Sequence, residues 1–340
     1  MTSFQNHLNK ILQDTVLNEK EMSQAMSEIM TGAVQEDHLE QFLISLSNRG
    51  EAVSEITGGA KIMREMASSI SSPDNATDCC GTGGDGQNTY NISTAVAFVC
   101  AACGIPMAKH GNRAASSKSG AADVLEALGI HLDLSKEQLE QALNDIGFCF
   151  LMAPAHHQAM KHVVPVRKKI GKRTIFNLLG PLANPANTKY QLMGVYDSKW
   201  VEPIAKTLKN LGTKSAWVVH GQDGLDEITT TAETNVAILK NDEIEIKTIS
   251  PEDFGLNRSN PEDLKGGNAD ENAEALLSVL NGEKNAYREI VVANAAAVIC
   301  IHNPENSIIQ SVKIAQEAID NHKALDVYNR YKAFSNEAQS

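Results

Sequence analysis

The segment DCCGTGGDGQNTYNISTA, residues 78–95, places several glycines between a short strand-like run and a polar stretch that leads into a helix. A backbone so rich in glycine either bends sharply or lets a ligand approach closely. Its N–H groups can converge on an anion, and the N-terminus of the following helix, near Ser93 and Thr94, adds positive potential. The segment therefore predicts an anion-binding loop. Its glycines are Gly81, Gly83, Gly84 and Gly86.

The same glycines match the G-x-G-x-x-G pattern of dinucleotide-binding folds. That fingerprint also requires an acidic residue about 20 positions further on, which holds a ribose hydroxyl. Here that region carries Lys109, Arg113 and Lys118 instead, so the chemistry is the opposite. A P-loop is excluded because no G-K-[ST] follows the glycines.

The basic loop adds a second set of anion-binding groups. Lys109 and Arg113 flank Asn112, and Ser116 and Ser117 follow as short hydrogen-bond donors. Together with the glycine loop they fit a substrate with more than one phosphate, although an ordinary solvated loop is the alternative. Asp85 repels phosphate unless it accepts from sugar hydroxyls or joins a metal network.

A third group is acidic and follows the strand-like run SAWVVHG. It contains Asp223, Asp226 and Glu227. Carboxylates in a loop at a strand end can hold Mg²⁺, which prefers oxygen ligands and shared phosphates. Solvated turn residues are the alternative, and the residues alone do not decide between the two.

Composition narrows the class of protein. The chain has 340 residues, 42% of them hydrophobic, which is enough for about two domains. Its net charge of −12 argues against a general nucleic-acid or membrane-surface binder. No apolar run approaches the roughly 20 residues of a membrane span, and the polar N-terminus lacks a signal core, so we expect a cytoplasmic protein. Cys100 and Cys103 lie in an apolar helix-like run, which favours packing over redox or zinc chemistry.

The elements that must position these groups change along the chain. The first seventy residues show the i, i+3, i+4, i+7 spacing of amphipathic helices, with a third helix expected over about 53–70. After a linker at 68–76, strand and helix patterns alternate, and residues 235–250 predict a hairpin around Asn241 and Asp242. The fold class expected is therefore α/β: a small all-helical N-terminal domain and a larger α/β domain with a central, mainly parallel sheet flanked by helices.

Several motifs occur together in one order: GTGGD, NIST, KHGNRAASSKSG, RTIFNLLGPLANP, GLDE and LKGGNADENA. In this order and spacing the chain resembles the anthranilate phosphoribosyltransferase family over nearly its whole length. The related pyrimidine nucleoside phosphorylases have serine and threonine where this chain has Gly111 and Asn112.

The resemblance implies transfer of the phosphoribosyl group of phosphoribosyl pyrophosphate to anthranilate, with release of pyrophosphate, in tryptophan biosynthesis. It also implies Mg²⁺ dependence and a homodimer held by a helical domain at 1–72, beside an α/β domain at 73–340. We expect neither nucleic acid nor membrane as a partner.

The resemblance also assigns residues. The metal positions are Ser93, Asp226 and Glu227, and anthranilate contacts Gly81, Asn112 and Arg167, with Pro154 and Pro181 beside His110 in the same cavity. No residue is assigned as catalytic. The phosphoribosyl pyrophosphate site is Gly81, Gly84, Asp85, Thr89, Asn91, Ile92, Ser93, Thr94, Lys109, His110, Gly111, Asn112, Arg113, Ala114, Ala115, Ser116 and Ser117.

Two alternatives remain at this point. Some proteins of this fold have lost the transferase activity and bind nucleic acid, but they should lack Arg167 and the Asp226–Glu227 pair and carry a basic face. A transferase for a different aromatic amine is the nearer alternative. The one departure from the family pattern is Ala121, where relatives commonly have a serine that contacts phosphate.

Overall fold

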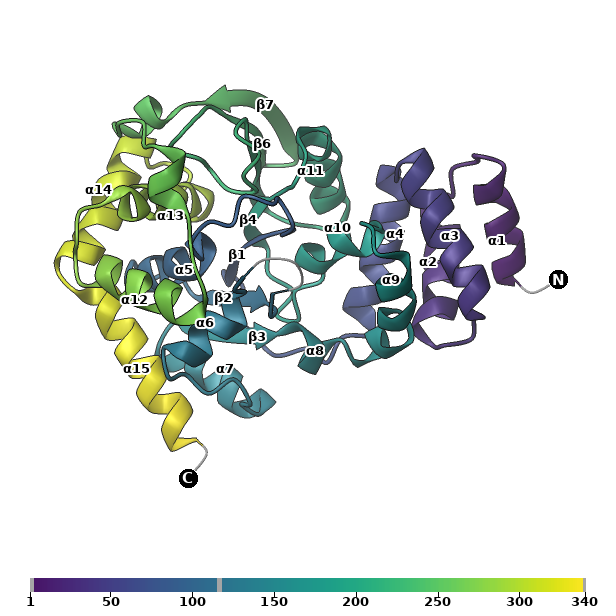
Figure 1. Ribbon diagram of the computed structural model, residues 1–340, viewed down its shortest axis with the longest axis horizontal. Coiled ribbons are helices and arrows are strands. Elements are labelled where there is room, and N and C mark those ends of the chain that lie inside the picture. The colour runs from purple at the N-terminus through teal and green to yellow at the C-terminus, as the bar shows by residue number, and fades with distance from the viewer. Residues whose placement is uncertain (1–2, 115–117, 339–340) are drawn as a thin grey trace.

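The computed structural model describes residues 3–114 and 118–338 and has a helical part beside a larger α/β part (Figure 1). In the helical part, Asn18 caps one helix by accepting from the Glu21 N–H, and the Glu21 carboxylate accepts from the Asn18 N–H in return. This reciprocal capping box satisfies two backbone donors that a helix start leaves free. The helices here are α1 (Ser3–Leu12), α2 (Glu19–Met30), α3 (Glu36–Arg49) and α4 (Val53–Glu65).

The α/β part is built on one seven-stranded sheet in the described residues, with the order β3-β2-β1-β4-β5-β6-β7. The first five strands pair in parallel, and β6 and β7 are antiparallel. Because the chain order reverses between β1 and β4, the carboxyl edge there is a switch point where α/β proteins bind ligands. The strands are β1 (Thr77–Gly81), β2 (Met107–Gly111), β3 (Phe148–Met152), β4 (Tyr190–Gly194), β5 (Ser215–Gly221), β6 (Thr234–Lys240) and β7 (Glu243–Ile249).

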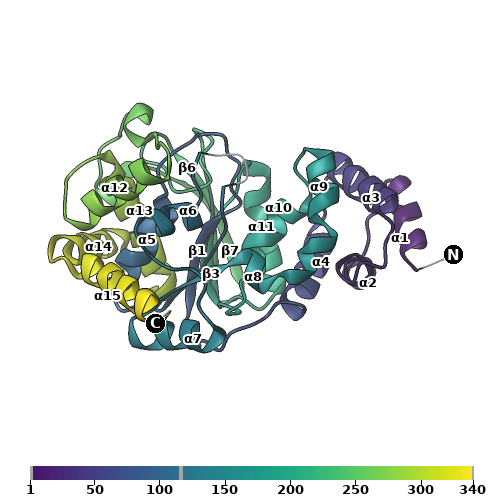
Figure 2. The same ribbon diagram turned by 60° about the horizontal axis from the view of Figure 1, so that its bottom comes forward.

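Helices cover both faces of this sheet (Figure 2). Alternate residues of one strand enter different cores: Trp217 and Val219 pack in the core with the C-terminal helices, whereas Val218 packs in the core shared with the helical part. This is the two-residue period of a strand buried on both faces. The remaining helices are α5 (Ile92–Ala102), α6 (Ala121–Ala127), α7 (Lys136–Asp145), α8 (Ala153–His156), α9 (Val164–Ile170), α10 (Ile175–Leu182), α11 (Val201–Asn210), α12 (Ala269–Leu280), α13 (Ala286–His302), α14 (Ile308–Asp320) and α15 (Lys323–Glu337).

The helical part is continuous with the rest of the molecule through its core. Phe42 of α3 and Ala60 of α4 belong to the same buried cluster as Leu179 of α10 and Met193 of β4. A side chain on Gly59 would lie 3.1 Å from Leu179, so the closest approach of α4 and α10 depends on that glycine. The segment α9–α10 therefore connects the helical part to the sheet.

The expected fold class is confirmed: helices come first and a mainly parallel sheet follows. The hairpin is confirmed too, since β6 and β7 pair and both Asn241 and Asp242 have the positive φ of a tight two-residue turn. The helix that we expected over about 53–70 is α4, and it ends at Glu65 rather than near Ile70. Its sequence continues into MASSI, whose two serines favour local hydrogen bonds over helix. No helix in the described ranges is long and apolar enough to cross a bilayer.

Candidate functional site: the carboxyl ends of the central strands

Asp226 lies tightly against the ends of β1 and β4. A Cβ on Gly81 would lie 2.1 Å from its carboxylate Oδ2, and a Cβ on Gly194 would lie 1.5 Å from its carbonyl oxygen. Both positions therefore require glycine. The Gly83 N–H donates to Asp226 Oδ2 over 2.7 Å, so the glycine loop and the acidic loop meet at the switch point of the sheet.

The negative charges of the carboxylates at this meeting point are not fully balanced by nearby positive charges. Burial, together with the negative charge of Asp85, raises the pKa of Asp226. Burial and the neighbouring Asp226 raise the pKa of Glu227 to about 8, although a Ser93 N–H and the charge of Lys109 act in the other direction. Buried carboxylates whose pKa values are raised in this way favour a bound cation, because a cation stabilises their charged form.

Lys109 is almost fully buried below the glycine loop, with 1% of its surface exposed. Its Nζ donates to the Cys79 carbonyl over 2.8 Å and to the Ser93 hydroxyl over 3.1 Å. Because β1, β2 and the start of α5 all converge on this ammonium, the two loops predicted from the sequence lie side by side. Ser93 is thereby placed next to the charge network.

The donor chemistry here fits Mg²⁺ when part of its coordination comes from a substrate. Among the described residues no three His, Cys, Asp or Glu side chains form a ready-made metal cluster. Mg²⁺ commonly uses one or two carboxylates, several waters and substrate phosphates. Asp226, Glu227 and the hydroxyl of Ser93 would supply the protein share. Asp223 has a different role, since its Oδ2 accepts from the hydroxyls of Thr229 and Thr231.

The C-terminal side of the glycine loop is held by residues far away in the chain. Asn91 accepts a hydrogen bond from Asn272 of α12 over 2.8 Å, and its carbonyl accepts from Tyr287 of α13 over 3.0 Å. Thr89 forms a bridge with Lys265. These contacts fix the backbone immediately before α5, in which Ile92 and Thr94 are buried.

The basic loop after β2 folds back on itself. Asp123 accepts from the N–H groups of Ala114 and Gly120, and a Cβ on Gly120 would lie 2.4 Å from the Ala114 nitrogen. Arg113 is exposed and its guanidinium pairs with Glu126 and Asp123 of α6. Its side chain is therefore engaged within its own loop. Ala115, Ser116 and Ser117 lie outside the described residues.

Ala121 begins α6, and its methyl group lies 3.4 Å from the position that a Cβ on Gly111 would take. The side chain at this position therefore presents a methyl group and no hydroxyl beside Gly111. Asn112 is exposed at the mouth of the loop, where its carbonyl accepts from the Ala122 N–H over 3.2 Å.

Arg167 is the residue on the helical side. It lies on α9, donates to Asn177 Oδ1 over 3.3 Å and lies over the ring of Phe176 at 5.7 Å. Burial lowers the pKa of its guanidinium. Within residues 3–114 and 118–338 it forms no salt bridge with a carboxylate. A partly buried arginine without a carboxylate partner favours an anionic ligand.

Two neutral imidazoles lie between these two sides. The rings of His110 and His157 are 5.3 Å apart and both are buried. Burial lowers the pKa of His110 to about 3 and that of His157 to about 4, with further lowering of His110 by the two neighbouring histidines and Lys109. Pro181 is buried in α10, and Pro154 is exposed at the start of α8.

Sequence reasoning missed three residues that support the site. Asp78 of β1 accepts from the His110 N–H over 3.1 Å, Asn272 holds Asn91, and Arg173 donates to the Gly84 carbonyl. A polar residue inside an apolar strand was the available signal for Asp78. Arg173 and Asn272 lie within the motifs RTIFNLLGPLANP and LKGGNADENA, but their contacts depend on segments far apart in the chain, so the motifs did not indicate their partners.

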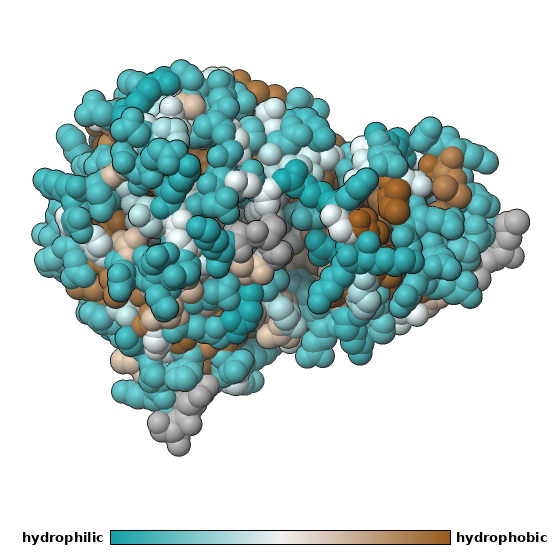
Figure 3. Space-filling model, in the orientation of Figure 1, coloured by the Kyte–Doolittle hydropathy of each residue, from teal (hydrophilic) through white to brown (hydrophobic). Residues whose placement is uncertain are grey.

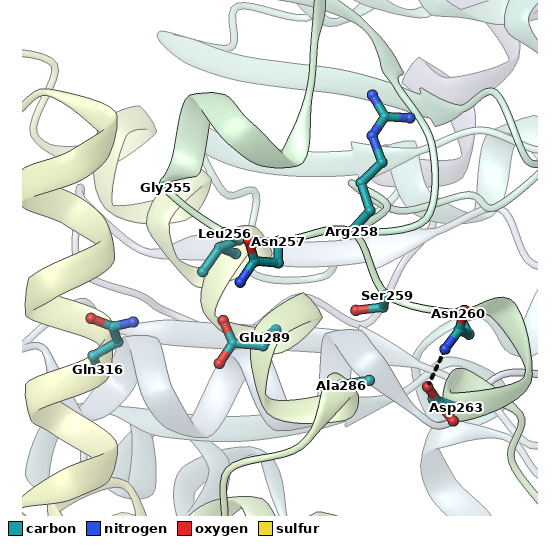
Figure 4. A pocket seen from close by; sticks show the side chains of 10 residues that line it. All are labelled: Gly255, Leu256, Asn257, Arg258, Ser259, Asn260, Asp263, Ala286, Glu289 and Gln316. Carbon is teal, nitrogen blue, oxygen red and sulfur yellow. Dashed lines mark hydrogen bonds between the residues drawn. The ribbon is translucent and has the colours of Figure 1, made fainter.

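A separate surface pocket of about 400 Å³ lies at the α13–α14 side of the molecule, and Figure 4 shows its lining. Arg258 at its rim already pairs with Glu233 and Glu252, and Asn260 donates to Asp263 over 3.2 Å. Arg258 therefore pairs with two carboxylates that do not themselves line the pocket. The strand ends, in contrast, bring the glycine loop, the acidic loop and a buried lysine together.

The fold and these strand-end loops define a two-domain glycosyl transferase. Residues 5–67 match the model described as "Glycosyl transferase family, helical bundle domain", and residues 73–325 match "Glycosyl transferase family, a/b domain". The chain is 51% identical to the anthranilate phosphoribosyltransferase of Azospirillum brasilense, over 99% of this chain and 94% of that one. It is 48% identical to that of Petrotoga mobilis, over 98% and 97%.

Solved structures agree. The anthranilate phosphoribosyltransferase of Thermus thermophilus superimposes with a TM-score of 0.92 at 39% identity, covering 97% of this chain and 99% of that one. The Saccharomyces cerevisiae enzyme, in complex with PRPP and Mg, superimposes with a TM-score of 0.90 at 26% identity, covering 98% of both. The chain belongs to the anthranilate phosphoribosyltransferase family.

Proposed function

We propose that the chain transfers the phosphoribosyl group of 5-phosphoribosyl 1-pyrophosphate to anthranilate, giving N-(5-phosphoribosyl)anthranilate and pyrophosphate in tryptophan biosynthesis. Its relatives over nearly the full length carry this activity in their names. The observation that supports it most is the meeting of Lys109, Ser93, Asp226 and the glycine loop at the strand ends, opposite a guanidinium without a carboxylate partner.

The phosphoribosyl pyrophosphate would bind across the two loops. Backbone N–H groups of the glycine loop and the start of α5 suit phosphate oxygens, since they carry positive potential without a side chain in the way. The residues expected to contact it are Gly81, Gly84, Asp85, Thr89, the stretch from Asn91 to Thr94 and the loop from Lys109 to Ser117. Of the basic residues among them, Lys109 is buried at the centre, whereas Arg113 is paired on the surface.

Mg²⁺ would be held by Asp226, Glu227 and Ser93 together with pyrophosphate oxygens. Bound there, the ion supplies positive charge to the leaving pyrophosphate. The chain's own part is to hold the Asp226 carboxylate in place through the Gly83 N–H and the glycine contacts at the ends of β1 and β4, while a Ser93 N–H donates to Glu227.

Anthranilate would bind on the other side of the site. Arg167 would pair with its carboxylate, and Asn112 and the bare backbone of Gly81 would complete the pocket. The neutral rings of His110 and His157 present an uncharged wall to the aromatic ring. The amine is then directed towards the anomeric carbon of the ribose.

The chemistry is substitution at that carbon. The new bond joins the amine nitrogen to the anomeric carbon while the bond to the pyrophosphate oxygen breaks, and the sugar gains oxocarbenium character. The electron pair of the broken bond leaves with pyrophosphate, and the nitrogen then releases one proton to give the neutral secondary amine. Anthranilate's amine is neutral, so little base assistance is needed before attack. The protein's contribution is therefore mostly positioning and charge stabilisation, and no side chain is assigned as a nucleophile.

The loss of anthranilate fluorescence tests the reaction. The purified chain with phosphoribosyl pyrophosphate and Mg²⁺ should quench the signal, and omission of either one should stop the loss. Substituted anthranilates and other arylamines serve as competing acceptors. If an arylamine that lacks the carboxylate reacts faster than anthranilate, that arylamine is the acceptor and the proposed substrate is wrong. If no amine reacts, the proposed transferase activity is contradicted.

We also propose that the chain is a cytoplasmic homodimer held by its helical part, with domains at 1–72 and 73–340. All six cysteines are free thiols, which suits a reducing compartment. The helical side carries apolar surface (Figure 3). Leu12, Val16, Ile44 and Val164 are all exposed there, at 52%, 50%, 38% and 38%.

Sedimentation of the intact chain tests the dimer. We expect a dimer at micromolar concentration, and Ile44→Glu should shift it towards monomer because a carboxylate cannot be buried cheaply in an apolar interface. Ile246→Glu is the matched control, since Ile246 is 55% exposed on β7 of the α/β part. A monomeric wild-type chain would contradict the proposal.

A further inference from the structure

Arg173 joins the helical side of the site to the glycine loop. It lies between α9 and α10, six residues after Arg167, and its side chain is exposed. Its guanidinium donates to the carbonyl oxygen of Gly84 and lies 4.2 Å from the centre of the Tyr196 ring. A planar guanidinium suits this combination, because one face stacks on a ring while its edge donates hydrogen bonds.

The neighbours of Arg173 are themselves anchored on both sides. The Ser47 hydroxyl of α3 donates to the Arg173 carbonyl over 3.2 Å. Tyr196 follows β4, and its N–H donates to the Thr82 hydroxyl over 3.0 Å. Thr82 in turn donates from its N–H to the Gly194 carbonyl over 3.0 Å. Arg173 thus touches the glycine loop from a frame built by α3 and the end of β4.

Beside the hydrogen bonds that the N–H groups of Thr82 and Gly83 donate, the Arg173 contact is the one that fixes the Gly84 carbonyl in the described residues. Gly83 and Gly84 both have positive φ and are exposed, and a Cβ on Gly83 would meet nothing within 4 Å. Glycine carries the largest conformational entropy to lose on ordering. A hydrogen bond to the Gly84 carbonyl fixes its peptide plane, and since C=O and N–H point in opposite directions across a trans peptide, it also turns the Asp85 N–H away from Arg173.

The charge of Arg173 is not used elsewhere. Throughout the described ranges it forms no salt bridge. Its positive potential therefore acts on the loop that we assign to phosphate. The segment that carries it is the same one that carries Arg167, so one stretch of backbone contacts both halves of the site.

We propose that Arg173 is a positioning residue. It holds the glycine loop in its anion-binding conformation by donating a hydrogen bond to the Gly84 carbonyl from the helical side. This rests on the proposed function, because it takes phosphoribosyl pyrophosphate as the ligand of that loop. Arg173 acts through the backbone of Gly84 and not on the anthranilate.

Arg173→Ala tests this through a split between the two substrates. We expect the KM for phosphoribosyl pyrophosphate to rise roughly tenfold, the lower end for a lost hydrogen bond to a charged group. The KM for anthranilate should change less than about twofold, since a small change in binding at one subsite leaves the other's contacts intact. Amide hydrogen exchange over residues 82–90 should become faster while exchange in β1 and β4 stays as in the wild type.

Three further variants separate position from charge and from general damage. Arg173→Lys keeps the charge but loses the planar fork, so it should restore only part of the affinity. Tyr196→Phe keeps the stacking ring and should behave as the wild type, whereas Tyr196→Ala should share part of the Arg173→Ala effect. Lys172→Ala removes the neighbouring exposed cation and is the matched control.

Titration calorimetry with Mg²⁺ and phosphoribosyl pyrophosphate distinguishes the failure of this inference from that of the proposed function. A wild-type chain that does not bind the pair would contradict the function. If the wild type binds it and Arg173→Ala binds it equally well, the inference is overturned. Equal rises in both KM values with faster exchange throughout the chain would also overturn it, because Arg173 would then be a general structural residue.

Discussion

The two halves of the site handle charge in opposite ways. At the strand ends, the negative charge of Asp85 acts on Asp226 and Glu227, and the positive charge of Lys109 offsets only part of it. That half therefore has an excess of negative charge that a bound metal ion would neutralise. On the helical side, one guanidinium, Arg167, has no carboxylate partner in the part of the chain that is described. The first half is suited to a cation and a polyanion together, and the second to one small anion.

The two halves are also held in place differently: backbone contacts position the residues of the first half, and side-chain packing positions the arginine of the second. Asp226 is held where only glycine fits, against the ends of β1 and β4. Arg167 is held by Asn177 and Phe176 on a neighbouring helix. We therefore expect changes in the first half to act on the chemical step, and changes in the second half to act on the binding of one substrate.

The largest expected effect comes from removing both negative charges of the first half. Asp226→Asn with Glu227→Gln should lower kcat at least about 100-fold, near 2.7 kcal/mol of transition-state stabilisation. The reason is that charge on the pyrophosphate grows as its bond breaks, so the metal acts mainly on the transition state. The Mg²⁺ concentration for half-maximal rate should rise while the KM for anthranilate hardly changes. Normal kcat and Mg²⁺ dependence would show that the metal is held elsewhere.

Arg167→Ala should show the reverse pattern. The KM for anthranilate should rise about 10- to 150-fold, since a hydrogen bond to a charged group is worth about 1.5–3 kcal/mol. The KM for phosphoribosyl pyrophosphate should change little. Lys168→Ala is the matched control, because Lys168 is the next residue on the same helix and is exposed. Equal effects on both substrates would remove Arg167 from the aromatic half.

The imidazoles between the halves predict a pH effect on stability. In the unfolded chain His157 takes up a proton near pH 6.5, but in the folded chain only near pH 4. Between these values the unfolded state binds more protons, so stability falls as pH decreases, by up to about 1.4 kcal/mol per pH unit per ring. His157→Gln should flatten the decline in the free energy of unfolding between pH 6.5 and 5 by about 2 kcal/mol. Denaturant titrations at each pH measure this, and an unchanged slope would show that the folded ring takes up its proton normally.

The smallest expected effect is that of Arg113→Ala. Its guanidinium already pairs with Glu126 and Asp123 on the surface, and exposed pairs of this kind contribute about 0–1 kcal/mol. The KM for phosphoribosyl pyrophosphate should change less than about threefold. Lys109→Met, which removes the buried ammonium, is the contrasting variant. A large effect of Arg113→Ala would show that its side chain leaves α6 when the substrate binds.

Local signals in the amino-acid sequence predict the order of elements and the identity of the chemical groups. Helical spacing, the turn at Asn241 and Asp242, and the glycine loop are local signals, because they depend on residues a few positions apart. The combination of motifs also determined the family, including the metal and carboxylate-binding candidates. The apolar run around Cys100 was correctly predicted as helix, and that thiol is buried in α5.

How those groups are held depends on contacts between distant segments, which the sequence does not reveal. Nothing near Asp226 in the chain indicates that its carboxylate meets Gly81 and Gly83, more than 140 positions earlier. The sequence also does not indicate that Arg113 pairs with Glu126 of α6, or that Arg173 donates a hydrogen bond to the Gly84 carbonyl. The physical reason is that charge, burial and hydrogen bonding depend on distance in space. In a parallel α/β fold the strand ends that set those distances come from segments separated by whole helices.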